Sequence, residues 1–327
     1  MTAVLTLVEH GDGRADRLSL EALAFADRLA GSRGAEVHAA LVGPGAAEAA
    51  GGLGGLGVAT AHVIDDDRLD AYAPAAWAAG LIDLIAAEPF AAVVAPGSER
   101  GTEVLAHVAA RTGGAMAANV VDVQTGERWK VTRQRWAGSL LEEAWLDGTP
   151  RLMTVAAHAV AALEPAPDAT APTIASRTPT LTDEDLRVRV TGHVAAATDR
   201  VSLTDAKVVV GGGRGIGSPE GFAMLEDLAA LLGGAVGVSR VATSLGWRPH
   251  ADQIGQTGAR IAPDLYIACG ISGAIQHIVG CKAAKRILVI NTDPDAPIFG
   301  RAAYAVIGDV HAVVPAIAAE IRRVRGS

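Results

Sequence analysis

The chain has 327 residues, a length that predicts two domains, and its net charge of −8 with scattered basic residues argues against nucleic-acid binding. Half of its residues are hydrophobic, but no apolar run approaches the roughly 20 residues of a membrane span and no secretory signal is recognisable, so we expect a cytoplasmic protein without membrane insertion. The two cysteines form no CxxC pair and the histidines are not clustered in sequence, which predicts neither a disulfide framework nor a metal site.

The first part of the chain alternates strand and helix patterns, which is typical of a mostly parallel sheet covered by helices. Strands are predicted at 4–9, 36–42, 61–64 and 91–95. Helices are predicted at 18–31, in a short Ala-rich stretch before 51–57, at 73–87 and at 102–111. Ser98 and Arg100, in the turn after the fourth strand, could form a phosphate nest, but a turn with a helix cap explains the segment as well and is favoured.

The pattern changes between residues 120 and 157, where polar and apolar residues alternate as in antiparallel strands. Trp129, Trp136 and Trp145 fall in this stretch, and such a cluster either seals a sheet edge or forms a partner interface. A proline-rich, irregular segment at about 164–187 is interpreted as a linker, and one more strand is predicted at 187–194. We therefore predict an α/β protein whose N-terminal domain, residues 1–200, has a mostly parallel sheet with helices and an antiparallel edge.

The C-terminal domain, residues 201–327, contains five further apolar runs that predict strands at 207–210, 235–238, 265–269, 286–290 and 304–307. Glycine-rich or polar segments follow these strands, and helical patterns lie between them. The alternation indicates a doubly wound parallel sheet, in which ligands bind beyond the carboxyl ends of the strands. We therefore expect one cofactor site at that edge.

Taken one at a time, the loop residues permit simpler explanations. The glycines before Arg214 are a weak indication of dinucleotide binding. Arg240, just past a buried strand, either meets an anionic ligand or forms a surface ion pair. Ser272 can cap a helix that begins near Ala274 and leave its first N–H groups free for phosphate, whereas a lone His277 also suits a structural role. The convergence of polar groups from five strands favours a large cofactor with phosphates.

Together these segments resemble the α subunit of electron transfer flavoproteins, the FixB family. The resemblance rests on two long strings and several shorter matches: Gly270-Ile271-Ser272-Gly273-Ala274-Ile275-Gln276-His277, Asp293-Pro294-Asp295-Ala296-Pro297-Ile298-Phe299, Gly212-Gly213-Arg214-Gly215, Val238-Ser239-Arg240, Gly255-Gln256-Thr257-Gly258, Asn291 and Asp309. It is strong over the second domain and diffuse over the first. The chain departs from the family at Ala242-Thr243-Ser244, where a carboxylate is usual, and at Ala259 and Thr292, where lysines are usual.

The resemblance implies a heterodimer of α and β subunits, with FAD bound mainly in the second domain of α. The implied cofactor-binding residues are Arg214, Gly215, Ser239, Arg240, Gln253, Ile254, Gly255, Gln256, Thr257, Gly270, Ser272, Gly273, Ala274, Ile275, Gln276, His277, Asn291, Asp309 and Val310. The segment 272–276 would serve the pyrophosphate, and Asn291 and Asp309 the adenosine end. Arg240, Thr257 and His277 would surround the flavin ring and tune its redox potential, and no catalytic residue or metal ligand is predicted.

The implied function is that of an electron carrier with no substrate chemistry of its own. The chain would accept electrons from acyl-CoA-type dehydrogenases of fatty acid β-oxidation and pass them to a membrane-associated quinone oxidoreductase. A flavin-bifurcating relative that oxidises NADH, with a second FAD in the β subunit, is the alternative within the family. A stand-alone flavin or NAD dehydrogenase is the alternative outside it, although the second domain offers no acid–base pair or partnered nucleophile. An adaptor without a cofactor is disfavoured because the ligand positions are intact.

Overall fold

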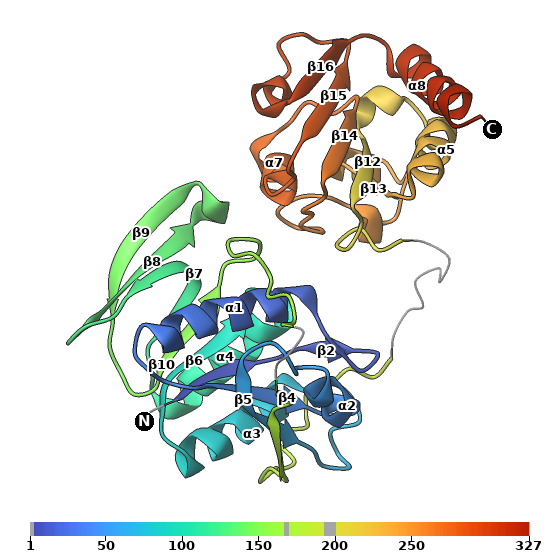
Figure 1. The fold of residues 1–327 in the computed structure, drawn as a ribbon. Coiled ribbons are helices and arrows are strands. Elements are labelled where there is room, and N and C mark those ends of the chain that lie inside the picture. The colour runs from blue at the N-terminus through green and yellow to red at the C-terminus, as the bar shows by residue number, and fades with distance from the viewer. Residues whose placement is uncertain (1–2, 167–169, 193–200, 327) are drawn as a thin grey trace. The chain divides into compact units, whose positions relative to one another are not determined.

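A computed structural model describes residues 3–166, 170–192 and 201–326. The chain divides into two compact units, Met1–Val194 and Ala195–Ser327, each with its own sheet and its own cores (Figure 1). Within the described part of the chain, no helix combines the length and the apolar character of a membrane span. Each unit has a separate hydrophobic interior.

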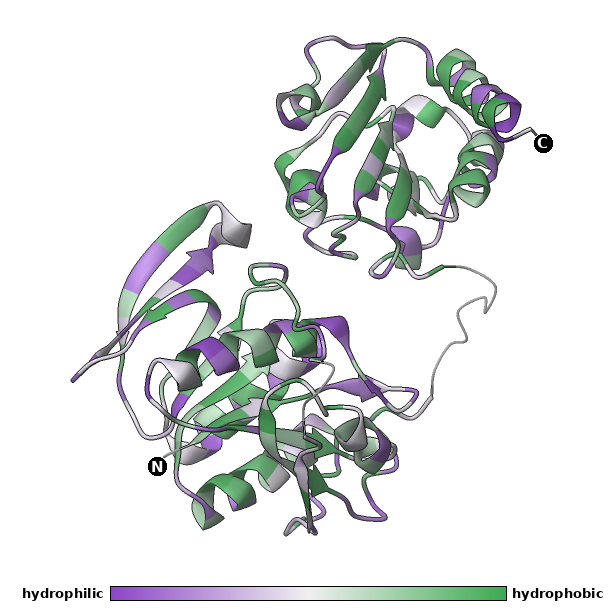
Figure 2. Ribbon diagram, viewed as in Figure 1, coloured by the Kyte–Doolittle hydropathy of each residue, from purple (hydrophilic) through white to green (hydrophobic). Residues whose placement is uncertain are grey.

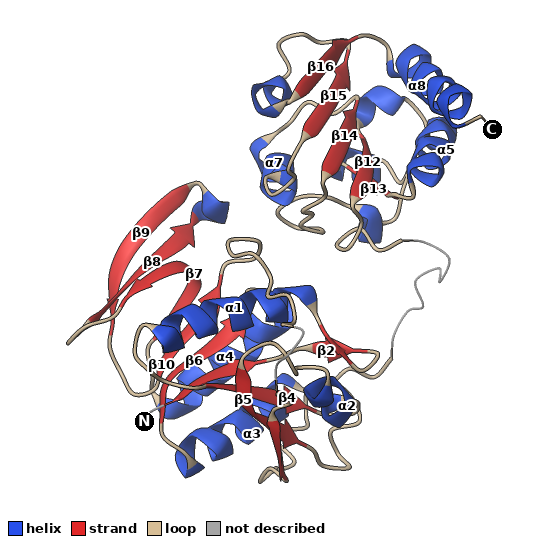
Figure 3. Ribbon diagram, viewed as in Figure 1, coloured by secondary structure: helices blue, strands red, loops and turns tan. Residues whose placement is uncertain are grey.

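The first unit contains a nine-stranded sheet in the order β11-β5-β4-β1-β6-β10-β7-β8-β9. All neighbours are parallel except the pairs β7–β8 and β8–β9, so the predicted parallel sheet with an antiparallel edge is confirmed (Figure 3). The strands are β1 (Ala3–Leu7), β4 (Val37–Val42), β5 (Val58–Ile64), β6 (Phe90–Pro96), β7 (Met116–Gln124), β8 (Trp129–Arg135), β9 (Leu140–Leu146), β10 (Arg151–Val155) and β11 (Thr173–Arg177), with a small hairpin of β2 (His10–Gly11) and β3 (Arg14–Ala15).

Three predictions for this unit are wrong. The stretch 120–157 is not wholly antiparallel, because β10 turns back and inserts between β6 and β7, parallel to both. The segment 164–187 is not irregular throughout, because β11 adds to the edge of β5. No strand forms in residues 187–192, where Val190 N donates to Tyr72 O (2.8 Å), while residues 193 and 194 lie outside the described residues.

Helices cover both faces of this sheet. They are α1 (Arg17–Gly31), α2 (Ala46–Gly51), α3 (Pro74–Ala87) and α4 (Glu99–Thr112). The apolar sides of α1 and α2 join one core and those of α3 and α4 the other, and the strands between them are predominantly apolar (Figure 2). Ser98 caps α4, its Oγ accepting from Gly101 N at 2.8 Å, which confirms the turn with a helix cap.

The second unit is a five-stranded parallel sheet in the order β13-β12-β14-β15-β16. Its strands are β12 (Val208–Gly212), β13 (Ala235–Val238), β14 (Leu265–Cys269), β15 (Ile287–Asn291) and β16 (Tyr304–Ile307). Its helices are α5 (Ala223–Leu232), α6 (Arg240–Ser244), α7 (Ile275–Cys281) and α8 (Val310–Arg325), with short 3-10 turns at Arg214–Ile216, Glu220–Phe222, His250–Asp252 and Pro297–Arg301.

Helices α5 and α8 pack on one face of this sheet, and residues of the α7 side form the core on the other, which confirms the doubly wound arrangement. From β12 the chain crosses to β13 on one side and later returns to β14 on the other. The helical connections after β12 and β14 therefore run over opposite faces of the sheet from neighbouring strands, and this reversal of strand order is the position at which open α/β sheets bind ligands.

Candidate cofactor site

The loops after β12 and β14 touch each other backbone to backbone at the reversal point. Gly213 N donates to Cys269 O (2.9 Å), and Gly215 N donates to Gly270 O (3.0 Å). A Cβ atom on Gly213 would lie 2.3 Å from Gly270 O, and one on Gly215 would lie 2.7 Å from Gly270 Cα. The glycines are needed here because any side chain would force the two loops apart.

A cavity of about 700 Å³ opens beside this contact, a volume within the range of small-molecule and cofactor sites. It is lined by residues that follow β12, β13, β14 and β15 and by the segment 253–257: Arg214, Gly215, Ser239, Arg240, Val241, Ser244, Leu245, Gln253, Ile254, Gly255, Gln256, Thr257, Gly270, Ile271, Ser272, Gly273, Ala274, Gln276, His277, Asn291, Thr292 and Asp293. All of the predicted cofactor-binding residues except Ile275, Asp309 and Val310 are among them.

The three exceptions occupy other positions. Ile275 is the first residue of α7, and its side chain is exposed. Val310 is buried in the core beneath α8. Asp309 caps α8, its Oδ1 accepting from His311 N at 2.9 Å, which explains an acidic residue at this position without a ligand.

The cavity also has lining residues that the sequence analysis missed. Val241, Ser244 and Leu245 come from α6 and the residue that follows it, and the exposed side chains of Val241 and Leu245 supply apolar surface. Helical spacing from Arg240 would have found Ser244, since residues four apart lie on one face. Ile271 and Thr292–Asp293 could have been inferred as sequence neighbours of predicted residues.

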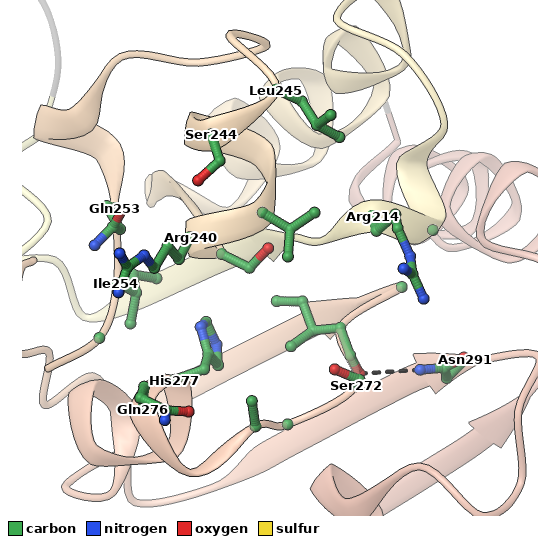
Figure 4. Close-up of a pocket in the computed structure, with 18 of the residues that line it drawn as sticks. Arg214, Arg240, Ser244, Leu245, Gln253, Ile254, Ser272, Gln276, His277 and Asn291 are labelled. Carbon is green, nitrogen blue, oxygen red and sulfur yellow. Dashed lines mark hydrogen bonds between the residues drawn. The ribbon is translucent and has the colours of Figure 1, made fainter. Parts of the chain in front are cut away.

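An arginine and neutral polar groups lie at each end of the cavity. Arg214 points toward Asn291 and Ser272 at one end, while Arg240 lies near Ile254 and His277 at the other (Figure 4). Among the described residues, neither guanidinium forms a salt bridge, so the surface ion pair, one of the two alternatives for Arg240, does not form. Two arginines with no carboxylate partner make the cavity suited to an anionic ligand.

Gln253 fixes the polar groups on one wall. Its side chain is buried, its Oε1 accepts from Thr243 Oγ1 (2.7 Å), and its Nε2 donates to Thr257 Oγ1 (3.0 Å). Because Thr257 accepts in this chain of hydrogen bonds, its own hydroxyl proton is available to donate elsewhere. Thr257 therefore offers a donor of defined position to a molecule in the cavity.

His277 offers a second polar group to the cavity. The ring is buried, its Nε2 lies 2.8 Å from the hydroxyl of Tyr266, and its Nδ1 has no hydrogen-bond partner in the described part of the chain. Burial lowers the pKa of His277 to about 4, although the backbone of Ile254 opposes the shift, so the imidazole is neutral near pH 7. Burial also raises the pKa of Tyr266 well above its ordinary value, so the phenol keeps its proton.

A phenol that donates to Nε2 leaves the imidazole proton on Nδ1. His277 then presents a buried N–H group whose contact with the backbone of Ile254 falls short of a hydrogen bond among the described residues. An unpaired buried donor of this kind costs free energy unless a ligand or water accepts from it. The residues therefore fit a molecule that brings a hydrogen-bond acceptor to this end of the cavity and negative charge along it.

The loop 271–274 is held from the side by Asn291. Its Nδ2 donates to Ile271 O (2.9 Å), and its Oδ1 accepts from Asp293 N (3.1 Å). The prediction that Ser272 caps α7 is wrong, because Ala274 occupies the N-cap position and no side chain caps the helix. Ser272 is exposed in the cavity wall instead, at the same end of the cavity as Arg214 and Asn291 (Figure 4).

Comparison with known proteins agrees with this arrangement. Residues 202–282 match the family model described as Electron transfer flavoprotein FAD-binding domain, and residues 4–181 match that described as Electron transfer flavoprotein domain. The chain is 38% identical over 329 residues to the electron transfer flavoprotein subunit alpha of Mycobacterium leprae, covering 100% of both chains. It is 34% identical over 321 residues to that of Bacillus subtilis (98% and 97% covered) and 33% identical over 326 residues to protein FixB of Clostridium saccharobutylicum (98% and 96% covered).

Proposed function

The chain belongs to the α-subunit family of electron transfer flavoproteins, whose second domain binds FAD, and from that premise we propose that FAD occupies the cavity at the reversal point of the five-stranded sheet. When bound, FAD supplies the ability to take up and release electrons one or two at a time. The protein's share is to hold the cofactor, to exclude competing reactions and to set its electrostatic surroundings.

The observation that carries this proposal is the convergence on one cavity of two arginines that form no salt bridge and one buried imidazole nitrogen that forms no hydrogen bond among the described residues. Arg214, Ser272 and the backbone of loop 271–274 supply positive charge and donors for a pyrophosphate. At the other end, Arg240, the Thr257 hydroxyl and His277 Nδ1 are three donors around a space suited to the polar edge of a flavin ring. A cation beside that edge favours added negative charge there, which raises the redox potential.

A β subunit is the proposed partner. Support comes from the antiparallel edge of the first unit, where Trp129 is buried but Trp136, Leu141 and Trp145 are 81%, 68% and 57% exposed. Strand β9 is also the last strand of its sheet, so one row of its backbone groups is unpaired by the sheet. Large exposed apolar side chains on an edge strand favour association with another protein. From the sequence, this aromatic cluster could either seal the edge or meet a partner. Trp129 is buried, and we propose that Trp136 and Trp145 meet the partner.

The proposed donors are acyl-CoA-type dehydrogenases of fatty acid β-oxidation, and the proposed acceptor is a membrane-associated quinone oxidoreductase. The test is to co-express the chain with its β partner, record the visible spectrum of the purified complex, and mix it with a reduced acyl-CoA dehydrogenase under anaerobic conditions. We expect flavin absorbance that bleaches on mixing and returns when the oxidoreductase and quinone are added. Absence of flavin after addition of FAD would refute the function, and bleaching by NADH would identify the bifurcating alternative.

A further inference from the structure

Two histidines far apart in the sequence meet on one face of the first unit's sheet. His38 lies on β4 and His62 on β5, and the register of these parallel neighbours pairs Ala40 with His62. His38 is therefore two residues away along β4 and points to the same face, since side chains alternate along a strand. His38 Nδ1 and His62 Nε2 are 3.0 Å apart.

A carboxylate completes the cluster. Glu88, which immediately follows α3, brings its Oε2 to 3.7 Å from His62 Nε2. The ligand atoms of His38, His62 and Glu88 all lie within 4.8 Å of one another, and this is the one such group among the described residues. Two imidazoles with one carboxylate form a set that binds Zn²⁺ and leaves a fourth position for water.

The surroundings of these three residues are those of a supported metal site. His38 Nε2 lies 3.6 Å from Glu36 Oε2, so a carboxylate stands behind one imidazole, and Arg177 pairs with the other oxygen of Glu88. Carboxylates that orient ligating histidines, and hydrogen bonds that hold ligating carboxylates, are typical of metal sites. The C-terminus of α3 also points its partial negative charge toward this region.

The ligands differ in their access to solvent. His62 is 1% exposed. Glu88 is 32% exposed, which gives the ion a route from solvent and gives the carboxylate freedom to move closer.

We propose that His38, His62 and Glu88 form a binding site for a divalent transition-metal ion of the zinc class, which would join β4, β5 and the turn between α3 and β6. Tetrahedral bonds of about 2.0–2.2 Å place ligand atoms roughly 3.3–3.6 Å apart. The two imidazole nitrogens, now 3.0 Å apart, would therefore separate slightly, and the Glu88 oxygen would move closer. Arg177 Nε now donates to His62 Nδ1 at 3.4 Å. If the metal binds His62 through Nε2, Nδ1 carries the ring proton and can no longer accept from Arg177, so this long hydrogen bond is lost. The bond between Arg177 and Glu88 is compatible with the metal.

The experiment is a titration of the complete chain, purified with its β partner and treated with a chelator. Zn²⁺ is added in a calorimeter, and Co²⁺ is added in a spectrophotometer, where tetrahedral coordination gives visible bands at longer wavelength than the flavin. We expect one tight site per chain, with Co²⁺ bands that Zn²⁺ removes. Glu36 touches a ligand and not the metal, so Glu36→Gln should weaken metal binding by no more than roughly 10- to 100-fold. His38→Gln and Glu88→Gln each remove a ligand and should weaken it by more than that.

His107→Gln is the matched control, because this histidine lies on α4 outside the cluster, and it should bind as the unaltered chain does. The His38 and Glu88 variants carry the test because His62 is fully buried and its replacement risks misfolding; circular dichroism verifies that they are folded. The proposal is overturned if the unaltered chain gives no Co²⁺ bands, or if folded His38→Gln and Glu88→Gln variants both keep its affinity. Equal loss in the His107 variant would also overturn it, because the binding would then be to surface histidines in general.

Discussion

Replacing Gly270 by Ala should separate the two loops on which the cofactor cavity depends. Gly270 has φ +61°, a left-handed conformation that costs a residue with a Cβ about 1–2 kcal/mol. In addition, the new Cβ would lie 2.7 Å from Gly215 Cα and 2.9 Å from Gly215 C. Both obstacles are backbone atoms, which cannot rotate away, so overpacking should add about 1–3 kcal/mol.

The free energy of unfolding should therefore fall by roughly 2–5 kcal/mol, and FAD affinity should fall with it because both glycines line the cavity. Gly233→Ala is a matched control: Gly233 has φ +62°, but nothing lies within 4 Å of its Cβ position. That variant should lose only the conformational cost and keep its FAD affinity. Urea unfolding and FAD titration of both variants measure the two quantities. Equal destabilisation of the two variants, with equal FAD affinity, would refute the reasoning.

Three further predictions concern the end of the cavity near Arg240 and His277, where we place the flavin ring. Tyr266→Phe removes the 2.8 Å partner of His277 Nε2 and should destabilise the protein by about 1–3 kcal/mol in urea unfolding, whereas an unchanged value would mean that this bond contributes nothing. The pKa of His277 in the folded protein, about 4, lies below its ordinary value of 6.5. The free energy of unfolding should therefore be highest above pH 6.5 and should fall by roughly 3 kcal/mol as the pH drops toward 4, because the unfolded chain then binds the proton more readily. His277→Gln should flatten this part of the pH profile of unfolding, and an identical profile would contradict the assignment. Arg240→Ala should lower the flavin potential by on the order of tens of mV in a redox titration, and an unchanged potential would exclude its tuning role.

The cavity could be predicted from the sequence because its parts obey a simple topological rule. Parallel strands deliver their following loops to one edge, so residues as distant as Arg214 and Asn291 could be assigned to one site without knowledge of strand order. The rule fails within helices and caps. It does not distinguish Ile275, which the first turn of α7 directs outward, from Gln276 on the cavity side, nor does it separate a helix cap such as Asp309 from a ligand contact.

The first unit was less predictable because its key contacts depend on strand pairing. Strand β10 is adjacent in sequence to antiparallel strands, yet its apolar residues suit the buried position between β6 and β7. The contact between His38 and His62 depends on which strands are neighbours and on their register, and neither follows from the spacing of two isolated histidines. Sequence periodicity indicates the face of a strand and not its partner.

The most direct test of the central claim is to titrate FAD into the deflavinated complex of this chain with its β partner, with Ser272→Tyr compared in parallel. Ser272 is exposed in the cavity wall, so a tyrosine there should fill space that the cofactor needs without disturbing the core. We predict uptake of one FAD per chain by the unaltered complex and little or none by the variant, with unfolding in urea unchanged. Full FAD uptake by the folded Ser272→Tyr complex would show that the cofactor binds somewhere other than this cavity.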